Sequence, residues 1–256
     1  MMSDLPSRPD NFANWFSLRN FTGARIALGR AGCGLPVKAH LEFQAAHARA
    51  RDAVHAELHV EDVKNDIISC GWPVRTVQSA APNRQVFLQR PDLGRLLSEE
   101  SKAQLSAPMI APDLVFILGD GLSSVAVERN ACPILKILWP QLVRSGFRMA
   151  PVILAAQARV ALADHIGELL QAKLSIMMIG ERPGLSAADS LGLYLTYQPR
   201  VGRVDSERNC ISNIHAKGMN ATDAATQTLQ LIKSIFSTGA SGVRLSAARD
   251  ALRPLP

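Results

Sequence analysis

The sequence predicts an α/β fold with a Rossmann-like, open and mostly parallel sheet, preceded by an N-terminal arm and helices. From about residue 112 onward, short apolar runs of strand length alternate with helix-length segments. A glycine-containing turn follows the first apolar run and opens a helical segment, as in βα units. The first 37 residues are instead rich in proline and glycine, which favours an extended arm over a packed element.

The N-terminal half differs in texture from the rest of the chain. We therefore expect an arm and helical region over residues 1–110 and a Rossmann-like domain over residues 111–256. Good helix formers with apolar residues near helical spacing predict a helix from Lys38 to Leu58. A second helix is expected after Asp92, a candidate N-cap, through LGRLLSEESKAQL.

The strands and helices of the second region follow in order. The segment DLVFILGDG predicts a buried strand, and the helical segment after it is expected to break near Pro133. APVILAA, LSIMMIG and LGLYLTY predict three further strands, with a crossover helix in VALADHIGELLQA after the first of these. The last helix is expected from about Ala221 to Phe236, with Asn220 or Thr222 as its cap and Gly239 just past its end. This alternation predicts right-handed crossovers and a ligand site at the carboxyl ends of the strands.

Composition excludes several classes of protein. The chain has 256 residues, of which 47% are hydrophobic and 20% charged, as in ordinary globular proteins. No apolar run approaches the roughly 18 residues of a membrane-spanning helix, and the first residues do not form a secretory signal. We therefore expect a cytoplasmic protein with no membrane partner. The four cysteines form no CxxC pair, which disfavours a zinc site or a disulfide framework.

The net charge of +6 could indicate an anionic partner. The basic residues are scattered, however, and only 5% of residues are aromatic, so we expect no nucleic-acid partner. Arginine outnumbers lysine by 21 to 7. Because arginine is enriched at protein interfaces, this ratio favours an extensive protein interface.

Two motifs suggest other chemistry. Gly119–Gly121 resembles the turn of a dinucleotide fold, but serine replaces the third glycine and no acidic residue ends the next strand. A dinucleotide-dependent oxidoreductase stays as an alternative, beside a noncatalytic interaction module. His55 and His59 have the spacing of helical zinc ligands, but Glu57 lies on the other side of the helix and no third ligand is evident. We expect a solvated helix face there and no metal ligand.

Polar residues concentrate after the third strand of the second region. They lie in Gly180–Leu185, Tyr197–Arg200 and Glu207–His215. Loops at the carboxyl ends of buried strands are where an open α/β sheet holds its ligand. The competing interpretation is that Arg182 or Arg208 forms a salt bridge that holds two loops together.

Several long blocks carry a family resemblance. They include DLVFILGDGLSSVAVERNA, APVILAAQARVALADHIGELL and IMMIGERPGLSAADSLGLYLTYQPRVGRVDSERNCISNIHAKG. Over about residues 24–243 the chain resembles the small subunit of ethanolamine ammonia-lyase. The resemblance implies an enzyme that converts ethanolamine into acetaldehyde and ammonia with adenosylcobalamin. It also implies a TIM-barrel large subunit as partner, with this chain completing the cobalamin site as a hetero-oligomer in the cytoplasm, free or inside a bacterial microcompartment.

The resemblance further implies three cobalamin contacts, at Val160, Glu181 and Cys210. Val160 is suited to apolar packing, Glu181 to accepting hydrogen bonds from the corrin's amides, and Cys210 to close contact with a large flat ligand. No catalytic residue is expected in this chain. None of the six histidines has Asp two residues before it, so the cofactor is expected to keep its own dimethylbenzimidazole on cobalt.

Overall fold

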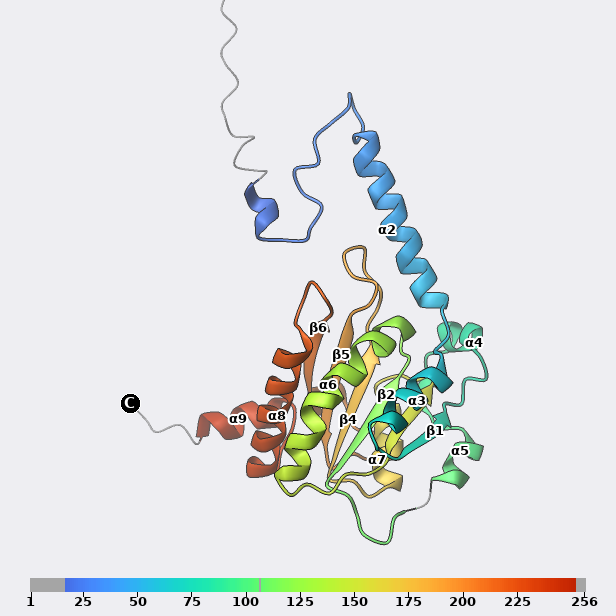
Figure 1. Ribbon diagram of the computed structural model, residues 1–256, viewed down its shortest axis with the longest axis vertical. Helices are drawn as coiled ribbons and strands as arrows, with labels where there is room; N and C mark the ends of the chain where they lie inside the picture. Colours follow the sequence, from blue (N-terminus) through green and yellow to red (C-terminus); the bar gives the residue numbers. More distant parts are fainter. Residues whose placement is uncertain (1–16, 106, 252–256) are drawn as a thin grey trace, which may run out of the picture.

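One six-stranded sheet runs through the centre of the computed structural model, which describes residues 17–105 and 107–251 (Figure 1). The strand order is β1-β3-β2-β4-β5-β6. The first four strands in this order are parallel, and β5 and β6 are antiparallel to their neighbours. The open, mostly parallel α/β sheet is therefore confirmed. The strands are β1 (Val74–Gln78), β2 (Leu114–Gly119), β3 (Val152–Ala156), β4 (Leu174–Gly180), β5 (Leu191–Tyr197) and β6 (Arg208–Ile214).

Helices cover the sheet on both faces. Side chains of α6 and α8 pack on one face, and those of α7 pack on the other. No helix within the described residues is long and apolar enough to cross a bilayer. The helices are α2 (Val37–His55), α3 (Val60–Ser69), α4 (Arg84–Gln89), α5 (Glu99–Gln104), α6 (Ser124–Arg144), α7 (Leu162–Leu169), α8 (Ala221–Thr238) and α9 (Val243–Ala251).

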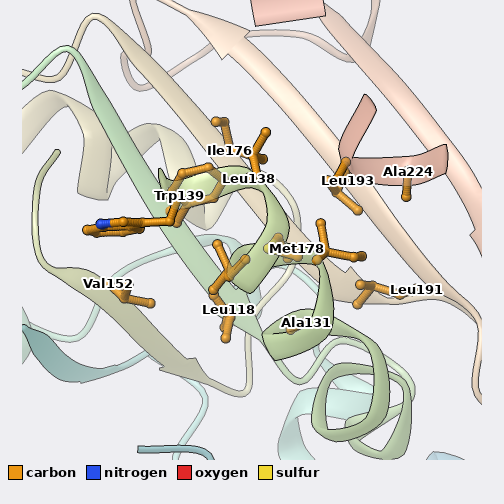
Figure 2. Packing of buried hydrophobic residues seen from close by; sticks show 14 of the residues in the cluster. Leu118, Ala131, Leu138, Trp139, Val152, Ile176, Met178, Leu191, Leu193 and Ala224 are labelled. Atoms are coloured by element: carbon orange, nitrogen blue, oxygen red, sulfur yellow. The ribbon is translucent and has the colours of Figure 1, made fainter. Parts of the chain in front are cut away.

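The larger apolar core lies between the sheet and α6. Figure 2 shows Leu138 and Trp139 of α6 close to Leu118 and Ile176 of the central strands. All six residues of β2 and all seven of β4 are buried, as is typical of parallel strands covered on both faces. The apolar segments that predicted β2 and β4 therefore form strands that are covered by other elements on both faces of the sheet.

Helix α6 is continuous, so the break expected near Pro133 is wrong. Pro133 and Pro140 both lie inside the helix, seven residues apart and exposed. Each proline deprives the carbonyl four residues earlier of its donor. Those carbonyls belong to Arg129 and Lys136, which are also exposed, so water can replace the missing donors.

The helix expected after Asp92 is interrupted. Only a 3-10 turn forms there, η2 (Leu93–Arg95), Asp92 makes no side-chain cap, and α5 begins later with Ser98 as its N-cap. Between these pieces the chain extends and bonds to the end of β1 and the residues that follow it. Ser98 N donates to Gln78 O (3.0 Å), and Ala80 N donates to Leu96 O (2.8 Å). Pairing with the sheet edge therefore replaces the helix.

The remaining elements of the N-terminal half are α2 and β1. The helix predicted from Lys38 to Leu58 is α2, which ends three residues early and projects beyond the sheet (Figure 1). Before it, the described arm holds one 3-10 turn, η1 (Leu18–Asn20), and the isolated bridge Ala31–Gly34. β1 was not predicted, and it pairs with β3. The division at residue 110 stays a prediction, although β1 brings a strand from the first region into the sheet.

The helix expected over Ala221–Phe236 is confirmed as α8, but it is not the last helix, because α9 follows it. Asn220 caps α8 by accepting a hydrogen bond from Asp223 N (2.9 Å), and Gly239 ends the helix with a φ of 67°. The left-handed conformation at this position favours glycine. Strand β6 was not predicted, because its sequence RNCISNI carries adjacent polar residues that break the apolar pattern of a strand.

Candidate functional site

The turn between β2 and α6 lies at the carboxyl edge of the sheet. Asp120 in this turn is 1% exposed and accepts hydrogen bonds from the amides of Gln157 (3.0 Å) and Ala158 (2.8 Å). Arg84 Nη1 donates to Asp120 Oδ2 (3.1 Å) and to the Gly121 carbonyl (2.8 Å). Burial raises the pKa of Asp120 and lowers the pKa of Arg84. The pair fills this part of the edge and ties the turns after β2 and β3 to α4.

The glycines of the same turn serve packing. Gly121 has a φ of 55°, and a β-carbon there would collide with the Gly180 carbonyl. That carbonyl accepts the Leu122 amide (3.0 Å), and Ser123 Oγ caps α6 by accepting from Ala126 N (3.3 Å). Since these groups bond within the protein, the arrangement fits a tight strand-to-helix turn and disfavours a pyrophosphate site.

Glu181 follows directly on β4, at the predicted edge of the sheet. Its amide donates to the Ser190 carbonyl (2.9 Å), and its Oε2 accepts from Ser190 Oγ (2.5 Å) and from Asn213 N (3.2 Å). Glu181 takes part in none of the ion pairs formed by the described residues. Both side-chain hydrogen bonds end on Oε2, so Oε1 retains its capacity to accept a further donor.

A β-bulge brings the Asn213 amide to this carboxylate. The register of β5 against β6 shifts beside Gly192, so Ser212 and Asn213 together face that residue. Asn213 has a φ of 63°, a left-handed conformation that asparagine tolerates. A β-carbon on Gly192 would lie 3.0 Å from Glu181 Oε1, so glycine gives the carboxylate its room.

Tyr194 and Cys210 lie beside Glu181 on the neighbouring strands. They are opposite each other in the β5–β6 register, with Tyr194 half-buried and Cys210 exposed. Partial loss of water around the thiol raises the pKa of Cys210, the Glu181 charge adds to this, and a hydrogen bond from Tyr194 opposes it. Burial, Cys210 and Glu181 together raise the pKa of Tyr194 above its usual range. Both groups are therefore mainly neutral near pH 7, and the raised pKa of Cys210 disfavours a role as nucleophile.

Val160 lies in the turn between β3 and α7. It is half-buried and packs on the apolar cluster beneath α7, against which Tyr194 also packs. The structure thus places Glu181 and Cys210 beside Tyr194, and Val160 packs on the same apolar cluster as Tyr194. The sequence had indicated three of these four residues.

Tyr194 and Ser190 are the site residues that sequence reasoning missed, whereas Asn213 lies in the predicted polar segment Glu207–His215. The alternation in LGLYLTY places Gly192, Tyr194 and Thr196 on one face of a strand, which is a signal that could have found Tyr194. Ser190 and Asn213 reach Glu181 through the strand pairing and the bulge, and no short-range pattern reports such contacts.

The histidine pair is divided between two elements. His55 is the last residue of α2, and His59 is the N-cap of α3. His59 Nδ1 lies 2.9 Å from Glu128 Oε1, an exposed contact at the end of α6. Across residues 17–105 and 107–251, no three His, Cys, Asp or Glu side chains gather closely enough to hold a metal ion.

Arg208 forms a salt bridge, but it ties β6 to α7 and does not hold two loops together. Its guanidinium donates to both oxygens of Asp164 at 2.7 Å and to Thr196 Oγ1 at 3.0 Å. Both partners of the ion pair have side chains only 2% exposed. Arg182 is exposed and forms none of the ion pairs of the described residues, although it follows Glu181 directly.

Known proteins resemble this chain over nearly its whole length. The family model for the ethanolamine ammonia-lyase light chain (EutC) matches residues 12–246. The chain belongs to this family. The ethanolamine ammonia-lyase small subunit of Xanthomonas campestris pv. campestris is 47% identical over 254 residues, which cover 98% of this chain and 92% of the relative.

Two further small subunits give the same picture. The protein of Pseudomonas putida (strain GB-1) is 48% identical, covering 93% of this chain and 88% of the relative. The protein of Azotobacter vinelandii is 45% identical, covering 98% of this chain and 94% of the relative. An independent dinucleotide-dependent oxidoreductase is therefore ruled out as the function, and the chain is a subunit of the lyase.

The residues present fit the cofactor that the family resemblance implied. Glu181 offers an unused acceptor oxygen beside Cys210, which is exposed and neutral. Gly192, which lacks a side chain, leaves room for the Glu181 carboxylate next to the Tyr194 ring. A corrin ring carries neutral amide side chains on a flat apolar body. Its amides can donate hydrogen bonds to Glu181, and its flat body can lie against the surface at Cys210.

Proposed function

We propose that this chain completes the adenosylcobalamin site of ethanolamine ammonia-lyase, which converts ethanolamine into acetaldehyde and ammonia. Adenosylcobalamin, when bound, supplies the radical chemistry of the reaction. The chain's own part is to bind and orient the cofactor and to exclude water from it. The observation that carries this proposal is the Glu181 carboxylate, held by neutral donors with one oxygen free.

Each proposed contact has its own task. Glu181 accepts hydrogen bonds from the corrin's amide groups, and such bonds to a charged acceptor contribute about 1.5 to 3 kcal/mol each. Val160 packs on an apolar part of the cofactor, and Cys210 lies close to its flat surface. Tyr194 lies opposite Cys210 in the strand register and supports the floor of the site. No residue of this chain is proposed to bind cobalt.

The partner in this proposal is the large subunit, which carries the substrate. Exposed apolar side chains on the arm and α2 support an interface there: they include Phe21 at 85% exposure and Val37 at 72%. Large apolar side chains left exposed in one region are typical of a surface that contacts another protein. We propose a hetero-oligomer in the cytoplasm.

Co-expression with a large subunit of the same family tests this function. The soluble complex should release ammonia from ethanolamine only when adenosylcobalamin is added. The chain alone and the large subunit alone are the controls. Ammonia release by the chain alone, or by the complex without the coenzyme, would contradict the proposal.

A further inference from the structure

A cavity of about 530 Å³ lies at the carboxyl edge of the sheet, beneath α2. The turns after three neighbouring strands contribute Leu122 after β2, Arg159 after β3 and Arg182–Leu185 after β4. Helices α2 and α4 close its other sides. The cavity is distinct from the Asp120–Arg84 pair, and it begins next to the proposed cobalamin contacts, because Arg159 precedes Val160 and Arg182 follows Glu181.

The lining of this cavity is basic. Arg51, Arg159 and Arg182 face it from three separate elements, together with His47 and His55, and no carboxylate lines it. None of the three arginines forms an ion pair with an acidic residue in the described part of the chain. The cavity therefore concentrates positive charge that the protein does not neutralise.

Arg159 is held in place by its surroundings. Its guanidinium lies over the Phe87 ring, 4.3 Å from the ring centroid, and its Nη2 donates to the Phe87 carbonyl (3.4 Å). Its Nε is buried and has no hydrogen-bond partner among the described residues. Burial lowers the pKa of Arg159, and the positive charges of Arg84, Arg95 and Arg182 lower it further. A bound anion would relieve both the unsatisfied donor and this repulsion.

We propose that this cavity binds a phosphate group, with Arg159 and Arg182 as its principal donors. Planar guanidinium groups donate two parallel hydrogen bonds to the oxygens of a phosphate, and arginine is the residue best suited to this geometry. Three arginines from separate elements can donate to the several oxygens of a phosphate. A carboxylate has only two oxygens and fits this arrangement less well.

The phosphate has two possible sources. One is the phosphodiester in the nucleotide loop of the cobalamin, and this source rests on the proposed function. The other is free inorganic phosphate. The first is favoured by position, since Arg159 and Arg182 each adjoin a proposed corrin contact.

The test uses the complex of this chain with its large subunit, with equilibrium binding as the readout. Adenosylcobalamin is compared with adenosylcobinamide, the corrin without the nucleotide and its phosphodiester, and inorganic phosphate is titrated separately by calorimetry. The variants are Arg159→Gln/Arg182→Gln and Arg182→Gln alone. Arg182 is exposed, so the single variant keeps the test usable if loss of the Arg159–Phe87 contact disturbs folding. Arg144→Gln, at an exposed arginine of α6, is the matched control.

We expect the double variant to bind adenosylcobalamin at least tenfold more weakly, and adenosylcobinamide within about twofold of wild type. This result supports the phosphodiester as the bound group. Loss of calorimetric phosphate binding with unchanged cobalamin affinity supports the same site with free phosphate as its occupant.

Unchanged binding of all three ligands in both variants overturns the phosphate site. An equal loss for both corrins, with phosphate binding intact, also overturns it. If the wild-type complex binds neither corrin, the proposed cobalamin function fails instead, and the phosphate titration still decides the cavity.

Discussion

Asp164 on α7 and Glu181 after β4 are carboxylates on the same face of the sheet, but they have different partners. Asp164 receives both hydrogen bonds of an Arg208 fork at 2.7 Å, and both side chains are 2% exposed. Glu181 is half-buried and accepts only from Ser190 and the Asn213 amide, which are neutral. The first carboxylate is neutralised within the protein, and the second is not.

This difference separates a structural role from a binding role. In a buried ion pair each charge is neutralised by the other. Removal of one member leaves an uncompensated charge inside the protein. A carboxylate fixed by neutral donors keeps its negative charge available to a ligand. We therefore expect changes at Asp164 to act on stability and changes at Glu181 to act on cofactor affinity.

The largest effect is expected for Asp164→Asn. The substitution leaves the buried Arg208 with only the exposed Asp205, 3.4 Å from its Nε, as a counter-charge. This loss should lower the free energy of unfolding by about 3 to 5 kcal/mol. Denaturant unfolding of the complex measures this. The double variant Asp164→Leu/Arg208→Met removes both charges and should be less destabilised than the single one. An Asp164→Asn protein as stable as wild type would show that the pair is not structural.

Asp113 sharpens the comparison from the opposite edge of the sheet. Burial alone would raise its pKa, but Arg148 and Lys173 lower the pKa of Asp113 to about 2. Because the folded value lies below the unfolded one of about 3.9, the stabilisation is complete above pH 4 and is lost as the pH falls through about 2. Asp113→Asn should cost about 1 to 2 kcal/mol at pH 7, less than Asp164→Asn because the cations are half-exposed.

Thermal melts of wild type and Asp113→Asn from pH 7 down to pH 2 test whether the stabilisation by Asp113 is lost as the pH falls. The gap between the two melting temperatures should close in this range. A gap that stays constant would mean that Asp113 is not charged through its partners.

For Glu181→Gln we expect a loss of cofactor affinity. Glutamine keeps the shape and one acceptor but removes the charge, so the apparent affinity for adenosylcobalamin should fall about tenfold, or about 1.4 kcal/mol. Ethanolamine affinity should change little, since the substrate is proposed to lie on the partner. Titration of each ligand into the complex measures both, and an equal fall in the two affinities would contradict the assignment.

The smallest effect is expected for Cys210→Ser. Serine is also small and neutral, so coenzyme affinity should change by about twofold, or about 0.4 kcal/mol, with ammonia release retained. Cys210→Phe in the same assay should weaken binding more, because its ring would occupy the exposed surface. Abolished turnover with Cys210→Ser would instead assign chemistry to the thiol.

The sequence predicts the central fold because its strands are buried on both faces. LVFILG and LSIMMIG are continuous apolar runs, which only strands between two helical layers require. The outer strands β1 and β6 have exposed residues, and β6 also carries a bulge, so their patterns are weak. Pro133 led to the wrong prediction of a helix break, because the effect of a proline depends on whether the carbonyl that loses its donor faces water.

The candidate site could be predicted only in part from the sequence, because some of its residues come from distant segments. The end of a buried strand places Glu181 at the ligand edge, and that inference needs no distant residue. Its neutral partners come from Ser190 and from the bulge at Asn213, nine and 32 positions away. The Arg159 cavity likewise assembles from turns after three strands, which only the tertiary structure brings together.

The central claim is that Glu181 is a ligand-binding carboxylate and Asp164 a structural one. A single paired experiment tests it: adenosylcobalamin titration and thermal melting of complexes carrying Glu181→Gln or Asp164→Asn. The account predicts a crossed pattern, in which Glu181→Gln weakens coenzyme binding about tenfold at an unchanged melting temperature. Asp164→Asn lowers the melting temperature with coenzyme affinity near wild type in the folded complex. A Glu181→Gln complex that melts early and binds the coenzyme as tightly as wild type would contradict the account.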